Sequence, residues 1–249
     1  MGRAEEKARY GYHVPHMILA GFAGAAVLVF GGVLLIATTV SSPWFVAVAV
    51  TCFAAGAVLI ALTSSLLWLV VLGRPLAMEH MLDAITWTGN ERILDVGCGP
   101  GLALVGAAKR LTTGRAVGID KWMVIHGERH NSREIALENA RIEGVADRVE
   151  VQDGDASAMP FDDGSFDVTM SSFVFHHMTK EVRLRSLREM VRVTKPGGRI
   201  LIADDRTGEL ATALQDLDVA SVVNLRLIFP VYLVSARKEK RHGTQQAGH

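Results

Sequence analysis

One stretch of sequence decides the fold of most of this chain. Residues 93–101 read Ile-Leu-Asp-Val-Gly-Cys-Gly-Pro-Gly, an apolar run that ends in a turn with glycine at every second position. Glycine has no Cβ, so such a turn lets a ligand approach the backbone, and a helix that starts beyond it offers free N–H groups and a partial positive charge. The segment therefore predicts a strand, a ligand-binding turn and a helix.

Strand and helix patterns alternate beyond this turn. Expected strands cover residues 93–96, 116–119, 149–151, 166–171, 199–203, 221–228 and 231–237, and expected helices cover 102–111 and 132–143. This alternation implies right-handed crossovers and a mostly parallel sheet with helices on both faces, which is an α/β fold. Asp120 ends the second strand at about the separation from Asp95, roughly 20 residues, at which a second acid accepts hydrogen bonds from a ribose.

A dinucleotide-binding enzyme is the nearest alternative for this pattern. Its fingerprint is G-x-G-x-x-G, whereas the sixth position here is Leu102 and the spacing is G-x-G-x-G. The spacing therefore argues against a dinucleotide.

Three later segments accompany the glycine turn, namely Gly154-Asp155-Ala156, Ser165-Phe166-Asp167-Val168 and Lys195-Pro196-Gly197-Gly198. Together, over about residues 91–238, they resemble the class I S-adenosylmethionine-dependent methyltransferases, especially the branch with the ubiquinone and menaquinone methyltransferases. The resemblance implies a Rossmann-like fold with a mostly parallel seven-stranded sheet, and S-adenosyl-L-methionine as the cofactor.

The resemblance also implies roles for single residues. Gly97, Gly99 and Gly101 would pass the methionine part of the cofactor close to the backbone. Asp95 would support its amino group, directly or through water, and Asp120 would hold the ribose hydroxyls.

The adenine ring would be held further along the chain. The resemblance implies that Asp155 accepts from the exocyclic amine and that the N–H of Ala156 meets a ring nitrogen, although Asp155 could instead be a turn acid. Trp122 would lie on the ring, or equally against the membrane or a neighbouring helix. Between Asp120 and Asp155 the chain is a few residues longer than usual, and Asn131 with Glu134 could cap the helix that begins near residue 132.

The segment after the fourth expected strand, residues 171–177, reads Ser-Ser-Phe-Val-Phe-His-His. In the family this region lines the junction of cofactor and acceptor, which places Ser171 beside the cofactor and makes His176 and His177 the candidates for accepting a proton from the acceptor, His176 first. Helix capping or a loop hydrogen bond is the alternative for either histidine. Two cysteines cannot form a four-ligand zinc site, so we expect no metal.

The N-terminal region has a different composition. All the charged residues, 26 basic and 26 acidic, lie outside residues 17–72. Residues 17–40 would span roughly 36 Å as a helix, more than the ~30 Å core of a bilayer, and residues 44–72 form a second uncharged run after Ser41-Ser42-Pro43. We predict a transmembrane hairpin, because a signal peptide would have a shorter apolar segment and no second span. Small residues at four-residue spacing, Ala20 with Gly24 and Ala47 with Thr51 and Ala55, would face each other in it.

Basic residues flank the hairpin on one side only. Arg3, Lys7 and Arg9 precede the first span and Arg74 follows the second, so the positive-inside rule places both termini and the catalytic domain in the cytoplasm. The predicted parts are an N-terminal segment (1–15), the hairpin (16–73), a connecting helix (74–90, extending to about residue 88), the methyltransferase domain (91–238) and a flexible tail (239–249).

A membrane-anchored methyltransferase that acts on a lipophilic small molecule, such as a quinone, phenol, lipid headgroup or hydrophobic thiol, is the function we expect. Only residues 206–219 separate the fifth strand from the last two, so the acceptor site would be lightly covered. A soluble acceptor, with the hairpin for localisation only, is the second hypothesis, and a non-catalytic scaffold is the third. Zero net charge and the absence of a long basic run argue against a nucleic-acid partner, and the oligomeric state is not predicted.

Overall fold

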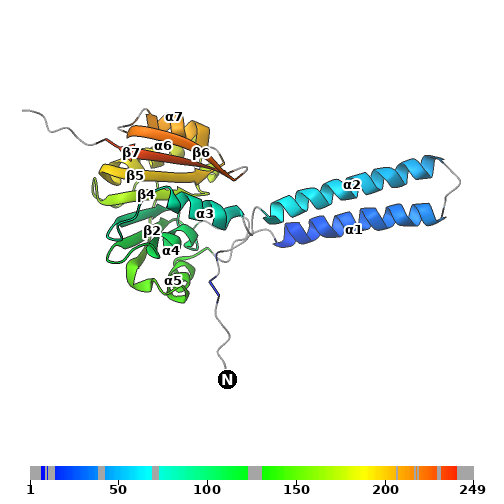
Figure 1. Cartoon of the computed structure of the whole chain (residues 1–249), viewed down its shortest axis with the longest axis horizontal. Helices are drawn as coiled ribbons and strands as arrows, with labels where there is room; N and C mark the ends of the chain where they lie inside the picture. The colour runs from blue at the N-terminus through cyan, green and yellow to red at the C-terminus, as the bar shows by residue number, and fades with distance from the viewer. Residues whose placement is uncertain are drawn as a thin grey trace, which may run out of the picture. The chain divides into compact units, whose positions relative to one another are not determined.

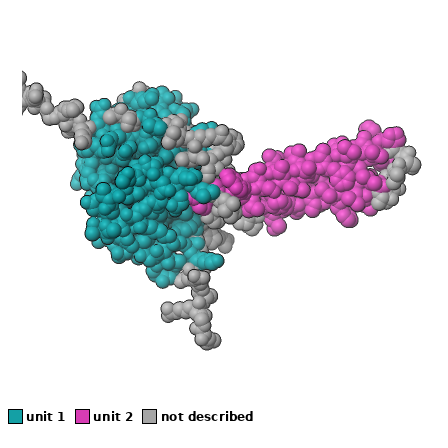
Figure 2. Space-filling view, viewed as in Figure 1, with its two compact units in different colours: residues 1–11, 76–249 teal, residues 12–75 magenta. Residues whose placement is uncertain are grey.

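The computed structural model of the chain (Figure 1) describes residues 7, 8, 10, 15–38, 43–68, 73–122, 131–205, 207–215, 217, 219–228 and 231–239. The chain divides into two compact units, one of residues Tyr12–Pro75 and the other of Met1–Gly11 with Leu76–His249, which Figure 2 shows in different colours. Each unit is described here by itself.

The first unit is a pair of helices, α1 (Pro15–Thr38) and α2 (Pro43–Trp68). Both are long and apolar enough to cross a membrane by length and composition. Large apolar side chains stand on their outer surfaces, with Phe30 70% exposed and Trp44 73% exposed. The expected spans, 17–40 and 44–72, match these helices within a few residues, while 39–42 and 69–72 lie outside the described part of the chain.

The two helices run antiparallel, because Gly21 lies against Thr63 and Gly32 lies against Phe53. The seam on α2 consists of Ala49, Gly56 and Thr63, which are buried and seven residues apart. A Cβ on Gly56 would come within 3.0 Å of Val29, so the small residue permits the close approach.

The four-residue pattern expected at this seam is wrong for most of its members. Ala20 on α1 is exposed, as are Ala47, Thr51 and Ala55 on α2. Small residues occur all around both helices, so their spacing alone does not identify the contact face.

Helix α3 (Arg74–Asp83) opens the second unit and packs on α4 (Leu102–Ala108). Leu82 is fully buried, and its Cδ1 lies 2.8 Å from where a Cβ on Gly106 would stand. Arg110 joins the two helices with 2.7 Å ion pairs to Glu79 and Asp83. The helix is shorter than expected, and its buried face holds Met81 and Leu82 whereas Leu76 is 44% exposed.

A seven-stranded sheet forms the centre of this unit, in the order β3-β2-β1-β4-β5-β7-β6. Its strands are β1 (Arg92–Val96), β2 (Arg115–Asp120), β3 (Val149–Asp153), β4 (Phe166–Ser172), β5 (Thr194–Asp204), β6 (Val219–Ile228) and β7 (Val231–Lys238). The first five are parallel, and β7 is antiparallel to β5 and β6. The predicted Rossmann-like α/β fold with a mostly parallel seven-stranded sheet is confirmed.

The remaining helices connect these strands, namely α5 (Arg133–Ile142), α6 (Lys180–Val193) and α7 (Thr207–Gln215), with short 3-10 turns at Ala146–Arg148 and Phe175–His177. The strand order reverses between β1 and β4, so right-handed crossovers place helices on opposite faces on the two sides of that point. Ligands of open α/β sheets bind beyond the carboxyl ends of the strands at such a reversal.

Two local expectations need correction. Ser132, not Asn131, caps α5, since its hydroxyl accepts from the N–H of Ile135. The fifth strand, expected over residues 199–203, begins earlier, at Thr194, ahead of residues 195–198. They belong to the strand, which bulges against β4 with Gly197 at φ 82°.

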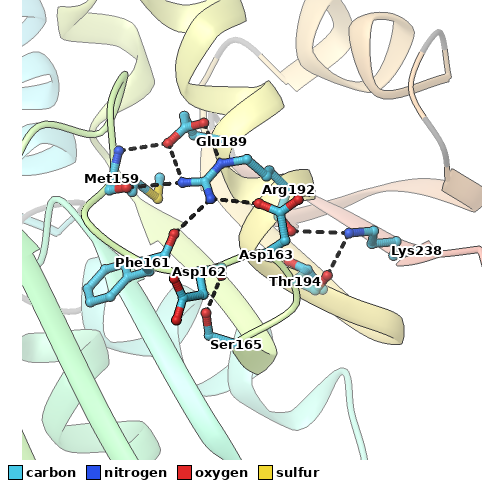
Figure 3. A network of polar contacts seen from close by, with 9 residues as sticks. All are labelled: Met159, Phe161, Asp162, Asp163, Ser165, Glu189, Arg192, Thr194 and Lys238. Carbon is cyan, nitrogen blue, oxygen red and sulfur yellow. Dashed lines mark hydrogen bonds and ion pairs between the residues drawn. The ribbon is translucent and has the colours of Figure 1, made fainter.

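The loop that leads into β4 is fixed by Arg192 of α6 (Figure 3). Its guanidinium donates to the carbonyls of Phe161 and Met159 at 2.7 and 3.0 Å and pairs with Asp163 at 2.8 Å. Glu189 holds the same guanidinium at 2.7 Å and accepts from the N–H of Met159. The network joins this loop to α6 on the second half of the sheet.

Candidate active site

The glycine turn follows β1 at the strand reversal. The N–H groups of Gly97 and Cys98 donate to the carbonyl of Ile119 on β2, at 2.8 and 3.1 Å. Gly97 has φ 72°, and a Cβ there would lie 2.5 Å from Val174, so both conformation and packing require glycine. At Gly99 and Gly101 a Cβ would meet nothing closer than 3.6 Å, and only their positive φ angles, 51° and 88°, favour glycine.

Asp95, at the end of β1, is fully buried, and neither of its carboxylate oxygens has a hydrogen-bond partner among the described residues. Burial and the charge of Asp120 raise the pKa of Asp95 to about 7, against the lowering effect of the nearby N–H of Leu104. A buried carboxyl without a partner is costly. A cationic amino group would supply the missing donors, so this position fits the methionine end of S-adenosylmethionine.

Asp120, at the tip of β2, holds two turns together. Its Oδ2 accepts from the N–H of Gly99 at 2.9 Å, and its Oδ1 accepts from the N–H of Trp122 at 2.8 Å. Each oxygen keeps a further lone pair for a ligand hydroxyl. The carboxylate is thus both a structural clamp and a possible ribose acceptor.

Trp122 follows Asp120 with φ 54°, a conformation that is strained for a bulky residue. Its indole N–H donates to Asp153 at 2.6 Å, and Asp153 is the register partner of Asp120 on β3. The ring is therefore held beside the tips of β2 and β3.

Asp155 has local partners, which support the alternative interpretation that it is a turn acid. Its Oδ1 accepts from both the N–H and the hydroxyl of Ser157 at 2.8 Å, and its Oδ2 pairs with Lys121 at 2.7 Å. Burial raises its pKa, but the bonds from Lys121 and Ser157 outweigh this and lower it overall. The N–H of Ala156, next to it, makes none of the hydrogen bonds found among the described residues.

Ser171, expected beside the cofactor, is held within the sheet. Its side chain is fully buried, and its hydroxyl donates to the carbonyl of Val96 at 2.8 Å, which ties β4 to β1. We therefore assign it to the sheet and leave it out of the proposed site.

Two residues near the turn were missed as site residues. Asn131 has a buried Oδ1 without a partner among the described residues, and a Cβ on Gly99 would lie 3.6 Å from this oxygen. Asn139 of α5 donates to the carbonyl of Pro100 at 2.8 Å and so holds the turn from outside. Asn139 could have been noticed as an amide within the helix expected over residues 132–143. Residues 123–130, which precede Asn131, lie outside the described part of the chain.

His176 lies beyond the end of β4 and contacts a buried acid at the end of β5. Its Nδ1 lies 3.2 Å from Oδ1 of Asp204, and Asp204 also accepts from the N–H groups of Phe175 and Asp205, at 3.0 and 2.8 Å. Burial raises the pKa of Asp204, but the hydrogen bonds from His176 and Asp205 and the charge of a protonated His176 lower it to about 2. Asp204 thus stays ionised and orients the imidazole so that Nε2 faces away from it.

His177 packs against His176, with 3.8 Å between the ring centroids and the ring planes tilted by 46°. Nδ1 or Nε2 of His176 and the carboxylates of Asp204 and Asp205 also offer three ligand atoms within 4.8 Å of one another, which is the geometry of a possible cation site. Asp204 already accepts from several protein donors, and this favours a hydrogen-bonding role.

Comparisons with known proteins agree with this geometry. Residues 94–202 match the family described as methyltransferase domain. The chain is 32% identical over 127 residues to methyltransferase GfsG of Streptomyces halstedii, covering 51% of this chain and 42% of that protein. It is 30% identical over 128 residues to the ubiquinone/menaquinone biosynthesis C-methyltransferase UbiE of Roseobacter denitrificans, covering 51% and 47%.

The fold also agrees with a solved structure. A SAM dependent methyltransferase from Aquifex aeolicus superposes with a TM-score of 0.53 at 22% identity, covering 64% of this chain and 88% of that one. The chain spans less than half the length of the two curated relatives. The family match over residues 94–202 agrees with the predicted methyltransferase domain.

Proposed function

We propose that the chain is an S-adenosylmethionine-dependent methyltransferase whose domain of residues 91–238 carries the activity. The family match over residues 94–202 supports this, and the buried, unpaired carboxyl of Asp95 beside the glycine turn is the observation that carries it. A fold kept only as a scaffold would have no need of an unpartnered acid at the centre of its sheet.

In this proposal each site residue has one task. Asp95 receives the amino group of the cofactor, the turn at Gly97–Gly101 lies along its methionine part, and Asp120 accepts from the ribose hydroxyls. Trp122 stacks on the adenine ring, whose edge meets Asp155 and the N–H of Ala156. Asn131 adds an acceptor beside Gly99.

The methyl group is activated by the sulfonium of the cofactor, so the protein mainly aligns the acceptor and excludes water. Nε2 of His176 takes the proton that the acceptor loses, and Asp204 stabilises the imidazolium that results. His177 borders the same space and contacts the acceptor.

We further propose that the helices α1 and α2 anchor the enzyme in a membrane, with both termini and the domain in the cytoplasm, and that the acceptor is lipophilic. The exposed apolar surfaces of these helices and the absence of charge within them support the anchor. The relatives support the acceptor class only by analogy, since one of them is a methyltransferase of ubiquinone/menaquinone biosynthesis.

Methyl-labelled S-adenosylmethionine tests the proposal. Membranes that contain the full chain should transfer label to a product that extracts with the lipids, and membranes with Asp120→Ala should transfer at least about tenfold less. Label that appears only in the aqueous phase would favour the soluble-acceptor alternative, and cofactor binding without any transfer would favour a scaffold.

Substrate access by the anchor has its own test. Deletion of residues 1–72 should leave cofactor affinity nearly unchanged but lower kcat/KM on a lipophilic acceptor in liposomes by about tenfold or more, because the local concentration is lost. Equal kcat/KM for the full and truncated chains would contradict the access role.

A further inference from the structure

A cavity lies at the end of the sheet opposite the glycine turn, where β4 and β5 begin. Its volume is about 560 Å³, and it is lined by residues at the amino ends of β4 and β5, the carboxyl end of β7 and the segment before β1. The glycine turn, Asp120 and His176 follow the carboxyl ends of strands. The cavity is therefore separate from the proposed active site.

Both acids that line this cavity are already satisfied. Glu91 accepts from the N–H groups of Thr88 and Gly89 at 2.6 and 2.9 Å, and these bonds lower its pKa although burial opposes them. Asp167 accepts from the N–H of Arg92 at 2.9 Å and pairs with Lys195 at 2.7 Å. Among the described residues neither carboxylate forms an ion pair with Arg199 or Arg237.

Other basic side chains near this end of the sheet also have partners. Arg92 lies over the ring of Phe166 at 4.8 Å, and Arg115 donates to the carbonyl of Asp147 at 2.7 Å. Lys238 donates to the carbonyls of Arg192 and Thr194, as Figure 3 shows. These groups are held by the protein itself.

Arg199 and Arg237 differ from them. They are register partners on β5 and β7, so their side chains leave the sheet on the same face, and both line the cavity. Neither has an ion pair or a side-chain hydrogen bond among the described residues. Like charges placed directly opposite in an antiparallel pair repel each other, so an anion bound between these two side chains would relieve the repulsion.

We propose that the cavity binds a phosphate-type anion between the guanidinium groups of Arg199 and Arg237. Guanidinium groups bind phosphate oxygens in pairs of parallel hydrogen bonds, and two of them on one face match a tetrahedral dianion. The phosphate can belong to a soluble compound or to the headgroup of an anionic phospholipid.

The test uses the full chain with inorganic phosphate and with lipid. Calorimetric titration of phosphate into the protein in nonionic detergent should give saturable binding for the parent. The double variant Arg199→Gln, Arg237→Gln should bind at least about tenfold more weakly. Arg188→Gln removes one exposed charge from α6 and should bind like the parent.

Hydrogen exchange in nanodiscs separates the two sources. Phosphatidylcholine nanodiscs with added phosphatidylglycerol, in phosphate-free buffer, should slow exchange of residues 85–91 relative to phosphatidylcholine alone if the anion is a lipid headgroup. Protection by inorganic phosphate alone assigns a soluble ligand. The proposal is overturned if neither probe binds or protects, or if the double variant responds as the parent does while its circular dichroism shows the native fold.

Discussion

Nδ1 of His176 lies 3.2 Å from a carboxylate oxygen of Asp204, an acid whose side chain has no exposed surface. The pair joins the segment after β4 to the end of β5, which is the neighbouring strand in the sheet. A buried, ionised partner fixes which nitrogen of the histidine carries a proton.

This pairing predicts that Asp204→Asn and His176→Gln lower methyl transfer by the same route. Each should reduce kcat by about tenfold to a hundredfold on an acceptor that loses a proton, with cofactor affinity unchanged. The double variant should be no slower than the slower single variant, because the two residues act as a unit. Additive losses in a kinetic double-mutant cycle would show that they act separately.

From the raised pKa of Asp95 we expect an unusual dependence of stability on pH. Its pKa is raised to about 7 in the folded chain, so its contribution is fully present below about pH 4 and is lost as the pH rises through 7. The free energy of unfolding should fall by about 4 kcal/mol in total, because the pKa of Asp95 lies about three pH units higher in the folded chain than in the unfolded chain. This change with pH can be measured by urea unfolding of residues 73–249 at several pH values, with Asp95→Asn as the reference. The same slope in both proteins would rule out Asp95 as its cause.

Trp122 predicts a stacking contribution to cofactor affinity. Trp122→Ala should weaken binding by about tenfold, in line with the ~1–3 kcal/mol of base stacking on an aromatic ring. Trp122→Phe keeps an aromatic ring for stacking, although a smaller one, and removes the indole N–H that donates to Asp153, so it should weaken binding much less. Equal losses for both variants, measured by calorimetry, would assign the effect to the Asp153 hydrogen bond.

Helix α3 predicts where the folded domain begins. Leu82→Ala should lower the free energy of unfolding of residues 73–249 by about 2–5 kcal/mol, because it opens a cavity against α4. Leu76→Ala, on the exposed side of the same helix, is the matched control and should change it little. A chain that starts at residue 91 should accordingly be less stable than one that starts at residue 73, and equal midpoints would contradict the packing role of α3.

The sequence predicted the sheet, the glycine turn and the acid at the tip of β2 because these depend on local patterns. Val96 to Gly101 and Asp120 occur at the expected strand ends, and every expected strand is present. The two apolar helices were also predictable from composition alone.

Other features depend on contacts that local patterns do not encode. The direction of Ser171 is set by its neighbour Val96 on another strand, and the role of Asp204 is set by a histidine 28 residues earlier in the chain. Strands β2, β3 and β5 end in acids, at Asp120, Asp153 and Asp204, so strand ends alone could have marked Asp204 as a candidate. The contact face of α2 depends on how the helix is rotated, which its uniformly apolar sequence leaves open.

Calorimetric titration of S-adenosylmethionine into the full chain tests the central claim most directly. The account predicts saturable binding at one site, weakened at least about tenfold by Asp120→Ala, which removes the acceptor for the ribose and the clamp on Gly99. Asp147→Ala, an exposed acid outside the site, should leave the affinity unchanged. The absence of binding by the folded parent protein, or equal binding by a folded Asp120→Ala variant, would contradict it.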